Sequence, residues 1–330
     1  MMNEVSSRFR EANRLFQKGS LNPKKKSAGF PEAESPRQTK SICWNYPQPK
    51  NVKPKPPSAD DPITRAFIGH AMKVHSAVGP GLDEEIYHQE LVSTLTAAGI
   101  SHLSKPRRDL VYRGFVADTF EPDFVVDNHF IPELKCLRGS FAPEHWVQVV
   151  CYCKFWRLRT SLLVDFGKQS LIWDRFLYRS HTASLPEIKP PAFVTNPSLA
   201  NEIIHVVAEC LNEIGLGYRQ TTWKGLVSAA IQSVGIKAHL NPSATVLNHP
   251  HITMPSLVID ETCAVFVTAL NDGITATERS TLQTHLRWLN LEWGIIFHFG
   301  KTTADFTFVQ NPKKKGLQQI QGGQQIIFSE

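Results

Sequence analysis

The chain contains 330 residues with a formal net charge of +6 at pH 7, and 42% of its residues are hydrophobic. This composition is ordinary for globular protein, and the length suits about two domains. No apolar run approaches the ~20 residues of a membrane span, and no basic segment followed by an apolar one predicts a signal peptide. The six cysteines contain no CxxC pair, so we expect reduced thiols, a cytoplasmic location and no membrane association.

The positive charge is concentrated in residues 1–60, which hold twelve Lys or Arg and five Asp or Glu. These residues carry about +7 by the usual ionisation rules, so the rest of the chain is close to neutral. The segment is rich in Lys, Pro, Ser and Asn, which predicts a disordered basic tail. A solvated tail and a weak, non-specific attraction to nucleic acid are both compatible with this composition.

Two helices are predicted after this tail. Asp61 followed by Pro62 is typical of a helix N-terminus, and a Gly-Pro-Gly run ends that helix after Val78. A second helix is expected from about 83 to 98, because its first turn is acidic and a glycine follows it. The later elements of the first half are expected as strands at 109–112 and 115–120, a hairpin within 121–138, a helix at 143–156, and strands at 161–164 and 171–176.

The central stretch of the first half is Glu121–Arg138, EPDFVVDNHFIPELKCLR. β-Branched and aromatic residues flank a turn-forming Asp-Asn-His cluster, which predicts a β-hairpin. Asp123 and Glu133 then lie nearly opposite each other. Because side chains alternate along a strand, Glu133 and Lys135 share a face while Leu134 points the other way. Two acids and one amine are therefore expected to converge.

Such a cluster has a chemical use. Two close carboxylates repel each other, which raises a pKa unless a cation lies between them. Hard cations such as Mg²⁺ are bound by carboxylates, with water in the remaining positions. A neighbouring ammonium can hold or polarise a metal-bound water for attack on a phosphodiester. The cluster therefore predicts a divalent-metal hydrolytic site, and the alternative is a solvated hairpin with its charges on the exposed face.

A proline-rich segment at 184–200 predicts a linker between two domains. The expected organisation is a basic tail at 1–60, a first domain at 61–183, a second domain at 201–311 and a C-terminal tail at 312–330.

The second half repeats the first. Residues 67–100 align with 203–236 at a constant offset of 136, and from Pro122 to Gly167 the offset is 133 without a gap. Apolar positions coincide along the alignment, which predicts the same fold in both halves.

The repeat lacks the charged cluster. In the order Glu84, Asp123, Glu133, Lys135, Gln148, Tyr152, the second half carries Gln220, Ser256, Phe266, Thr268, Thr281 and His285. The core pattern persists while every one of these polar positions changes, so the second half reads as the same fold with its site erased. We expect the two halves to associate as an intrachain pseudo-dimer, with further self-association through the second half as an alternative.

Residues 63–178 resemble the GxxExxY proteins of the PD-(D/E)XK nuclease-like superfamily. The matching residues follow the order of that pattern: Gly81-Leu-Asp-Glu84-Glu-Ile-Tyr87, then Asp123 on a strand, then Glu133 and Lys135 as E-x-K on the next strand, then Gln148 and Tyr152 as a helical Q-x-x-x-Y. The resemblance implies an α/β fold of two tandem restriction-endonuclease-like (PD-(D/E)XK) domains, each a central mixed sheet flanked by helices.

The resemblance also implies a site chemistry. Its implied ligands for Mg²⁺ (or Mn²⁺) are Asp123, Glu133 and Glu84. Lys135 would orient the attacking water and offset developing phosphoryl charge. Gln148 and Tyr152, one helical turn apart, would position the substrate or brace Lys135. The implied partner is DNA or RNA.

Several of these residues have simpler interpretations. Glu84 also suits the first turn of a helix, Gln148 and Tyr152 also suit an ordinary helix face, and Tyr87 is expected to be a core aromatic. Pro132 removes a ladder donor, which predicts an edge strand or a local bulge beside Glu133.

Two functions remain open from the sequence. The leading prediction is a metal-dependent nuclease with one active and one inactive half. The alternative is a catalytically silent nucleic-acid-binding or assembly protein that retains the nuclease fold.

Overall fold

The computed structural model describes residues 61–312, so the tails predicted at 1–60 and beyond 312 lie outside the described residues. These residues form mixed α/β structure with two five-stranded mixed sheets, which confirms the predicted class. Within residues 61–312, no helix is long and apolar enough to cross a bilayer. The cysteines of this part of the chain are free thiols: Cys136, Cys151, Cys153, Cys210 and Cys263.

The first half follows the predicted order of elements. Its helices and strands are α2 (Pro62–Val78), α3 (Glu84–Ala97), β1 (His102–Ser104), β2 (Arg108–Tyr112), β3 (Phe115–Phe120), β4 (Phe124–Val126), β5 (Phe130–Lys135), α4 (Pro143–Trp156), β6 (Thr160–Asp165) and β7 (Ile172–Leu177). The sheet has the order β1-β4-β5-β6-β7, and β2 pairs with β3 in a separate hairpin. Only β1 was not predicted, because its three residues are too short to show a period.

The second half has the same order of elements. They are α5 (Pro197–Ile214), α6 (Gln220–Gln232), β8 (Ala238–Leu240), β9 (Ser243–Val246), β10 (His249–Thr253), β11 (Leu257–Ile259), β12 (Cys263–Ala269), α7 (Ala276–Trp288), β13 (Trp293–Phe299) and β14 (Ala304–Gln310). Its sheet runs β8-β11-β12-β13-β14, with β9 and β10 as a separate hairpin.

The strand registers of the two sheets also correspond. Phe130 pairs with Thr160 in the parallel pair β5–β6, and Cys263 pairs with Trp293 in the parallel pair β12–β13. Each residue of the second pair lies 133 positions after its counterpart in the first, which is the offset of the sequence alignment. The other neighbouring pairs of both sheets are antiparallel. The two sheets therefore share strand order, strand direction and register.

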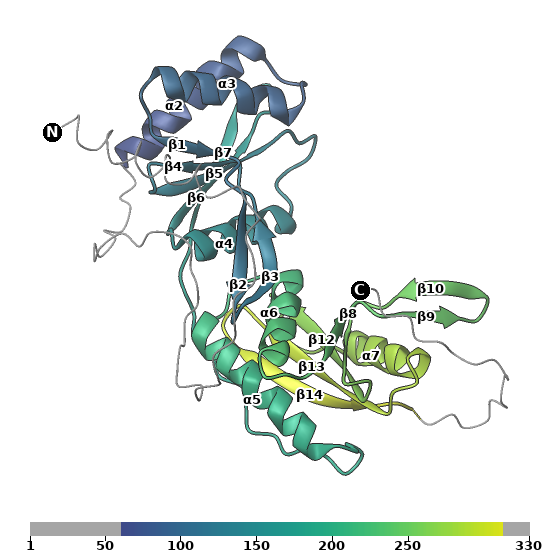
Figure 1. Cartoon of the computed structure of the whole chain (residues 1–330). Coiled ribbons are helices and arrows are strands. Elements are labelled where there is room, and N and C mark those ends of the chain that lie inside the picture. Colours follow the sequence, from purple (N-terminus) through teal and green to yellow (C-terminus); the bar gives the residue numbers. More distant parts are fainter. Residues whose placement is uncertain (1–60, 313–330) are drawn as a thin grey trace, which may run out of the picture. The chain divides into compact units, whose positions relative to one another are not determined.

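Each sheet is covered by helices on both faces (Figure 1). In the first half, apolar residues of α2 and α3 pack with Phe124, Phe130 and Leu134 on one face. The other face meets α4, because Val125 and Ile131 belong to a cluster with Cys151, Tyr152 and Trp156 of that helix. The alternation of side chains along β5 thus places Leu134 and Glu133 on opposite faces of the sheet.

Pro132 corrects one prediction. β5 lies between β4 and β6 in the interior of the sheet, so it is not an edge strand. Its parallel ladder with β6 is continuous through Pro132, which pairs with Leu162. Between β4 and β5, the paired residues are Val126 and Phe130. A missing N–H on the β4 side interrupts the ladder there, so the irregularity is local and falls beside the charged cluster.

One hydrophobic cluster contains residues from both halves of the chain. At its edge, Arg113 pairs with Glu209 and Glu213, each at 2.9 Å. Helix α6 contacts β3 closely: a Cβ added at Gly225 would overlap the carbonyl oxygen of Ala117. A glycine is required at this point of α6 because any side chain would collide with the backbone of β3.

We expect Gly225→Ala to lower the free energy of unfolding by about 1–3 kcal/mol, because the methyl group must displace rigid backbone. Gly69 is the matched control, since it also lies in a helix but has open space around its Cβ position. Gly69→Ala should raise stability by about 0.5–1 kcal/mol. Urea unfolding measures both, and stabilisation by Gly225→Ala would contradict the close packing.

Candidate active site

The two predicted acids meet where β4 and β5 lie side by side. The backbone N–H of Leu134 donates to Oδ2 of Asp123 at 2.8 Å, and the N–H of Asp123 donates to Oε2 of Glu133 at 3.3 Å. Both residues are buried, at 9% and 3% relative exposure. The hairpin therefore brings the carboxyl groups together and gives each a backbone donor, as its sequence predicted.

Lys135 completes the cluster from the same strand. Its Nζ donates to Oε1 of Glu133 at 2.9 Å and to the carbonyl oxygen of Leu134 at 2.6 Å. The Leu134 side chain is fully buried in the core on the opposite face. The expected alternation along β5 is therefore present, with the acid and the amine on one face of the sheet.

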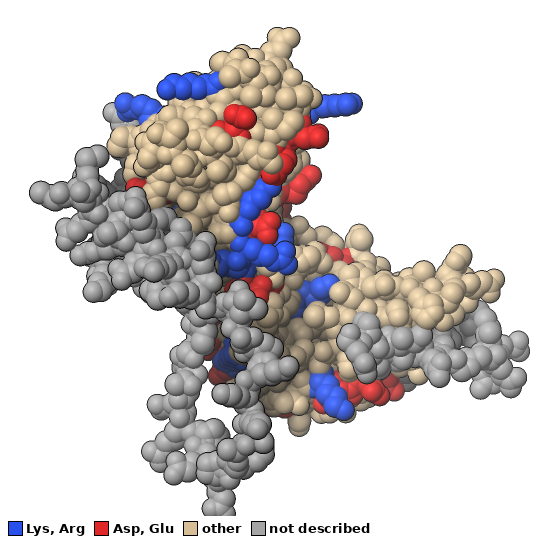
Figure 2. Space-filling model, turned by 45° about the horizontal axis from the view of Figure 1, so that its top comes forward, with Lys and Arg blue, Asp and Glu red and all other residues tan. Residues whose placement is uncertain are grey.

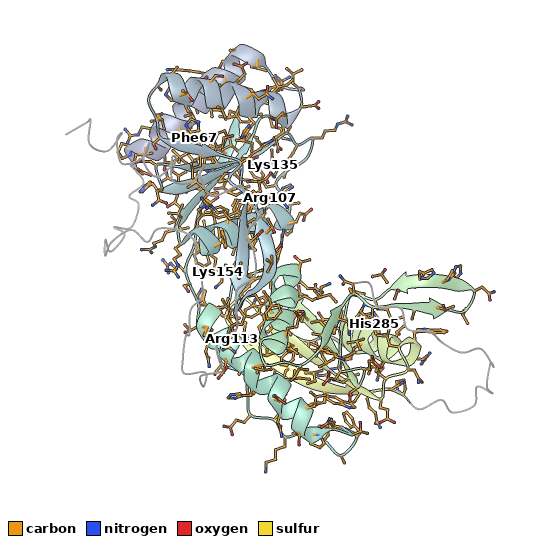
Figure 3. The ribbon with its side chains drawn as sticks, in the orientation of Figure 1. Phe67, Arg107, Arg113, Lys135, Lys154 and His285 are labelled. Atoms are coloured by element: carbon orange, nitrogen blue, oxygen red, sulfur yellow. The ribbon has the colours of Figure 1, made fainter. Side chains whose placement is uncertain are left out.

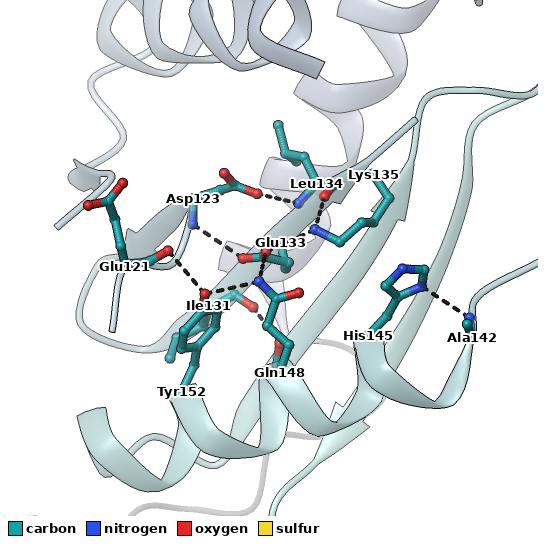
Figure 4. A network of polar contacts seen from close by, with 11 residues as sticks. Glu121, Asp123, Ile131, Glu133, Leu134, Lys135, Ala142, His145, Gln148 and Tyr152 are labelled. Carbon is teal, nitrogen blue, oxygen red and sulfur yellow. Dashed lines mark hydrogen bonds and ion pairs between the residues drawn. The ribbon is translucent and has the colours of Figure 1, made fainter. Parts of the chain in front are cut away.

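Helix α4 supplies two more of the predicted residues (Figure 4). Nε2 of Gln148 donates to Oε1 of Glu133 at 2.6 Å and to the Tyr152 hydroxyl at 3.0 Å. That hydroxyl donates to the carbonyl oxygen of Glu121 at 3.1 Å. The predicted roles of this pair were to position the substrate or to brace Lys135. Gln148 contacts the Glu133 oxygen that Lys135 also contacts, and Tyr152 lies behind Gln148.

The charges of the cluster are strongly perturbed. Burial, followed by the nearby charge of Asp123, raises the pKa of Glu133 to about 8. Burial works against the ammonium of Lys135, but the Glu133 carboxylate prevails and raises the pKa of Lys135 above its usual value. A buried pair of carboxyl groups attracts a cation, because a positive charge offsets both the desolvation cost of the carboxylates and their mutual repulsion.

Glu84 lies near this cluster at the first residue of α3. Burial raises the pKa of Glu84, while Lys135 lowers it and Asp123 raises it. Its electrostatic neighbours therefore include two members of the cluster. Within the described residues, however, no group of three or more potential ligands is arranged to hold a metal ion, so Asp123, Glu133 and Glu84 do not form the predicted three-ligand set.

The residues present nevertheless fit a hard divalent cation. Mg²⁺ typically uses one or two protein carboxylates and keeps several waters. Asp123 and Glu133 offer that number of carboxylates in adjacent positions, and Lys135 and Gln148 already direct their donors at the same oxygen of Glu133.

Tyr87 serves the core, as expected. Its hydroxyl donates to the carbonyl oxygen of Gly79 at 2.6 Å and accepts from the N–H of Leu82 at 3.2 Å. Its ring stacks on Phe166 with centroids 4.7 Å apart. Tyr87 thus fixes the turn that leads into α3 and positions Glu84 one turn earlier on the same helix.

Two histidines beside the site were not identified from the sequence. His88 is buried, stacks on Phe124 at 4.5 Å, and hydrogen-bonds the carbonyl oxygen of Asp123 through Nε2 at 3.3 Å. His145 precedes Gln148 by three residues on α4, and its Nδ1 accepts from the N–H of Ala142 at 3.0 Å. Their spacing from Glu84 and Gln148, one helical turn in each case, was the available signal.

The corresponding positions of the second half are neutral. Oγ of Ser256 hydrogen-bonds Nδ1 of His285 at 2.7 Å, and the ring of Phe266 lies edge-on to His285 at 5.8 Å. Burial lowers the pKa of His285 to about 4. Thr268 hydrogen-bonds His298 at 2.8 Å. Ser256, Phe266 and Thr268 thus replace the two acids and the amine of the first half with side chains that carry no charge.

Comparison with known families agrees with this geometry. The model of the PD-(D/E)XK nuclease superfamily matches residues 61–176, which contain all six predicted site residues. This match confirms the superfamily resemblance for that part of the chain. Neither a curated protein nor a solved structure matches the chain significantly.

Glu133→Gln should stabilise the metal-free protein at alkaline pH. The pKa of Glu133 is raised from 4.5 to about 8 in the folded state. The neutral side chain therefore contributes stability that is fully present below pH 4.5 and is lost as the pH rises through about 8. Glutamine stays neutral. We expect a gain of about 2 kcal/mol at pH 8 that shrinks towards pH 5, measured by urea unfolding in EDTA.

The exposed Glu187→Gln is the control and should change stability little at either pH. An equal, pH-independent effect of both substitutions would show that Glu133 is ionised without cost in the folded protein.

Proposed function

We propose that this protein is a metal-dependent nuclease that hydrolyses phosphodiester bonds of DNA or RNA, with its site in the first half. The observation that supports this most is the convergence of Asp123, Glu133 and Lys135 on one face of β4 and β5, braced by Gln148. The superfamily of the matching region points to the same substrate class.

In this proposal Asp123 and Glu133 hold Mg²⁺ or Mn²⁺, which when bound supplies an activated water and offsets charge on the phosphoryl oxygens. Lys135 donates to Glu133 and to the Leu134 carbonyl oxygen at rest and has one further donor with which to orient a water beside the substrate. Gln148 fixes the orientation of the Glu133 carboxyl group, and Tyr152 fixes Gln148. These two are positioning residues.

The second half would be an inactive copy that associates with the first as an intrachain pseudo-dimer. The shared strand order and register support a common fold, and the contacts of Gly225 and Arg113 support association. Phe266 stands where Glu133 stands in the first half, and its ring packs on His285. An apolar side chain there binds no metal, which supports hydrolysis by the first half alone. The domain boundaries near 183 and 201 and the cytoplasmic location remain predictions.

Cleavage assays with variants of both halves test the activity. With Mg²⁺ or Mn²⁺ and single- or double-stranded DNA and RNA, we expect Asp123→Asn and Lys135→Ala each to lower the cleavage rate by about 10²-fold or more, because each removes a group that acts on the reacting phosphate. Matched substitutions in the second half, Ser256→Ala and Thr268→Ala, should leave the rate nearly unchanged.

Thermal melting curves check that each variant folds. Metal-dependent cleavage that persists in both first-half variants would reject the proposal. Nucleic-acid binding without cleavage by the wild type, lost together with its salt dependence on deletion of residues 1–60, would favour the silent binding protein instead.

Metal binding is the second test. We expect the wild type to bind Mn²⁺ and Asp123→Asn to bind it at least about tenfold more weakly, because a carboxylate ligand becomes an amide of the same shape. Calorimetry measures both affinities, with Ser256→Ala as the control. Equal affinities would place the ion elsewhere in the protein.

A further inference from the structure

A cavity of about 480 Å³ lies at the far end of α4 from Gln148, among residues that the nuclease proposal does not use. Its lining residues are Lys154, Arg157, Leu158, Arg159, Tyr178, Arg179, Ser180, Glu213 and Ile214. They come from the end of α4, the short connection between α4 and β6, the chain after β7 and the end of α5. The volume falls in the range of small-molecule pockets.

The charge of this cavity is strongly positive. Three arginines line it and are exposed to solvent: Arg157, Arg159 and Arg179. The one acid in the lining, Glu213, accepts hydrogen bonds from Arg113 at 2.9 Å and from the Tyr112 hydroxyl at 3.0 Å. Arg113, which also pairs with Glu209, offsets part of the charge of Glu213, and the four cations of the lining, Lys154 and the three arginines, outnumber this one acid.

Lys154 has a different task in the same place (Figure 3). It is buried, and its Nζ donates to the carbonyl oxygens of Ile214 at 2.7 Å, Gly215 at 3.1 Å and Leu216 at 2.8 Å. All three donors of the ammonium are used, and they satisfy carbonyls at the C-terminal end of α5. Lys154 thus adds positive charge to the wall, while Arg159 and Arg179 line the cavity and are exposed to solvent.

The fold itself does not require these arginines. At the offset that relates the two sheets, the positions of Arg157, Arg159 and Arg179 are occupied in the second half by Asn290, Glu292 and Pro312. The comparison is sharpest at the first of these. Arg157 has φ 55° and Asn290 has φ 54°, a left-handed conformation that Asn adopts readily and that costs other side chains roughly 1–2 kcal/mol. The backbone conformation at this position is therefore kept in both halves, while the side chain differs.

We propose that this cavity binds the phosphate groups of a nucleotide or of a nucleic-acid strand. Guanidinium groups match phosphate oxygens in pairs and remain charged at all physiological pH values. Tyr178 adds a ring to the wall against which a base can stack. The ligand class follows from three cations around a cavity large enough for a nucleotide.

This site is separate from the candidate active site. Gln148 and Arg157 lie at different places on α4, about 14 Å apart along its axis at 1.5 Å per residue. On the described face shown in Figure 2, Lys and Arg side chains are interspersed with Asp and Glu. The cavity differs from this face in that guanidinium groups cluster around it. The inference goes beyond the proposed hydrolysis, and it stands or falls without it.

Fluorescence anisotropy of the full chain in EDTA tests the site, because hydrolysis does not proceed without divalent metal. The probes are a fluorescent ATP analogue and a labelled twelve-nucleotide DNA without terminal phosphates. We expect Arg159→Gln/Arg179→Gln to weaken binding of at least one probe by about tenfold or more and to lower its salt slope by about two. Weakening of the ATP analogue alone identifies a free nucleotide, and weakening of the DNA identifies strand phosphates.

The matched control is Arg279→Gln/Arg287→Gln, which removes the same charge from exposed positions of α7. It should bind both probes as the wild type does. Undiminished binding by the cavity variant, or equal weakening by the control, would overturn the proposal, as would failure of the wild type to bind either probe. The two proposals fail separately. If the wild type shows no nuclease activity but only the cavity variant binds the probes more weakly, the cavity proposal is supported and the hydrolytic function alone is rejected.

Discussion

Two backbone N–H groups hold the carboxyl groups of Asp123 and Glu133 together in a buried position, those of Leu134 and of Asp123 itself. Burying two acids side by side is costly unless hydrogen bonds or a cation compensate. Here Lys135 and Gln148 both donate to Glu133, and the raised pKa of that residue shows that compensation is incomplete. The fit to a divalent cation and the contact that Gln148 of α4 makes with Glu133 both depend on this pair.

The second half shows what the same backbone looks like without that constraint. Ser256, Phe266 and His285 fill the corresponding places with uncharged contacts, and the strand register is unchanged. The acids of the first half are therefore not needed to form the sheet. The same comparison shows that the fold does not require Arg157 and Arg159, because Asn290 and Glu292 occupy their positions in the second half. At both places the polar side chains differ between the halves, while the strand order and register are the same.

Sequence reasoning succeeded where the signal was local and missed contacts between distant segments. The hairpin, the facing of Glu133 and Lys135, and helix α4 followed from alternation, turn residues and a proline at the first helical position. Of the two alternatives predicted from Pro132, an edge strand or a local bulge, the edge position was wrong, because a proline disturbs one side of a strand and leaves the other free to pair with β6. His88 went unnoticed because its contact with Asp123 joins a helix to a strand 35 residues away.

The sequence by itself determined the order of elements, the pairing of Asp123 with Glu133 across a hairpin and the internal repeat, because these depend on side-chain periodicity and on chemistry within a few residues. Tertiary structure decided that Gln148 contacts Glu133, that Lys154 caps α5, and that three arginines line one cavity. Those contacts depend on how helices pack on sheets, since packing places side chains that no local pattern relates.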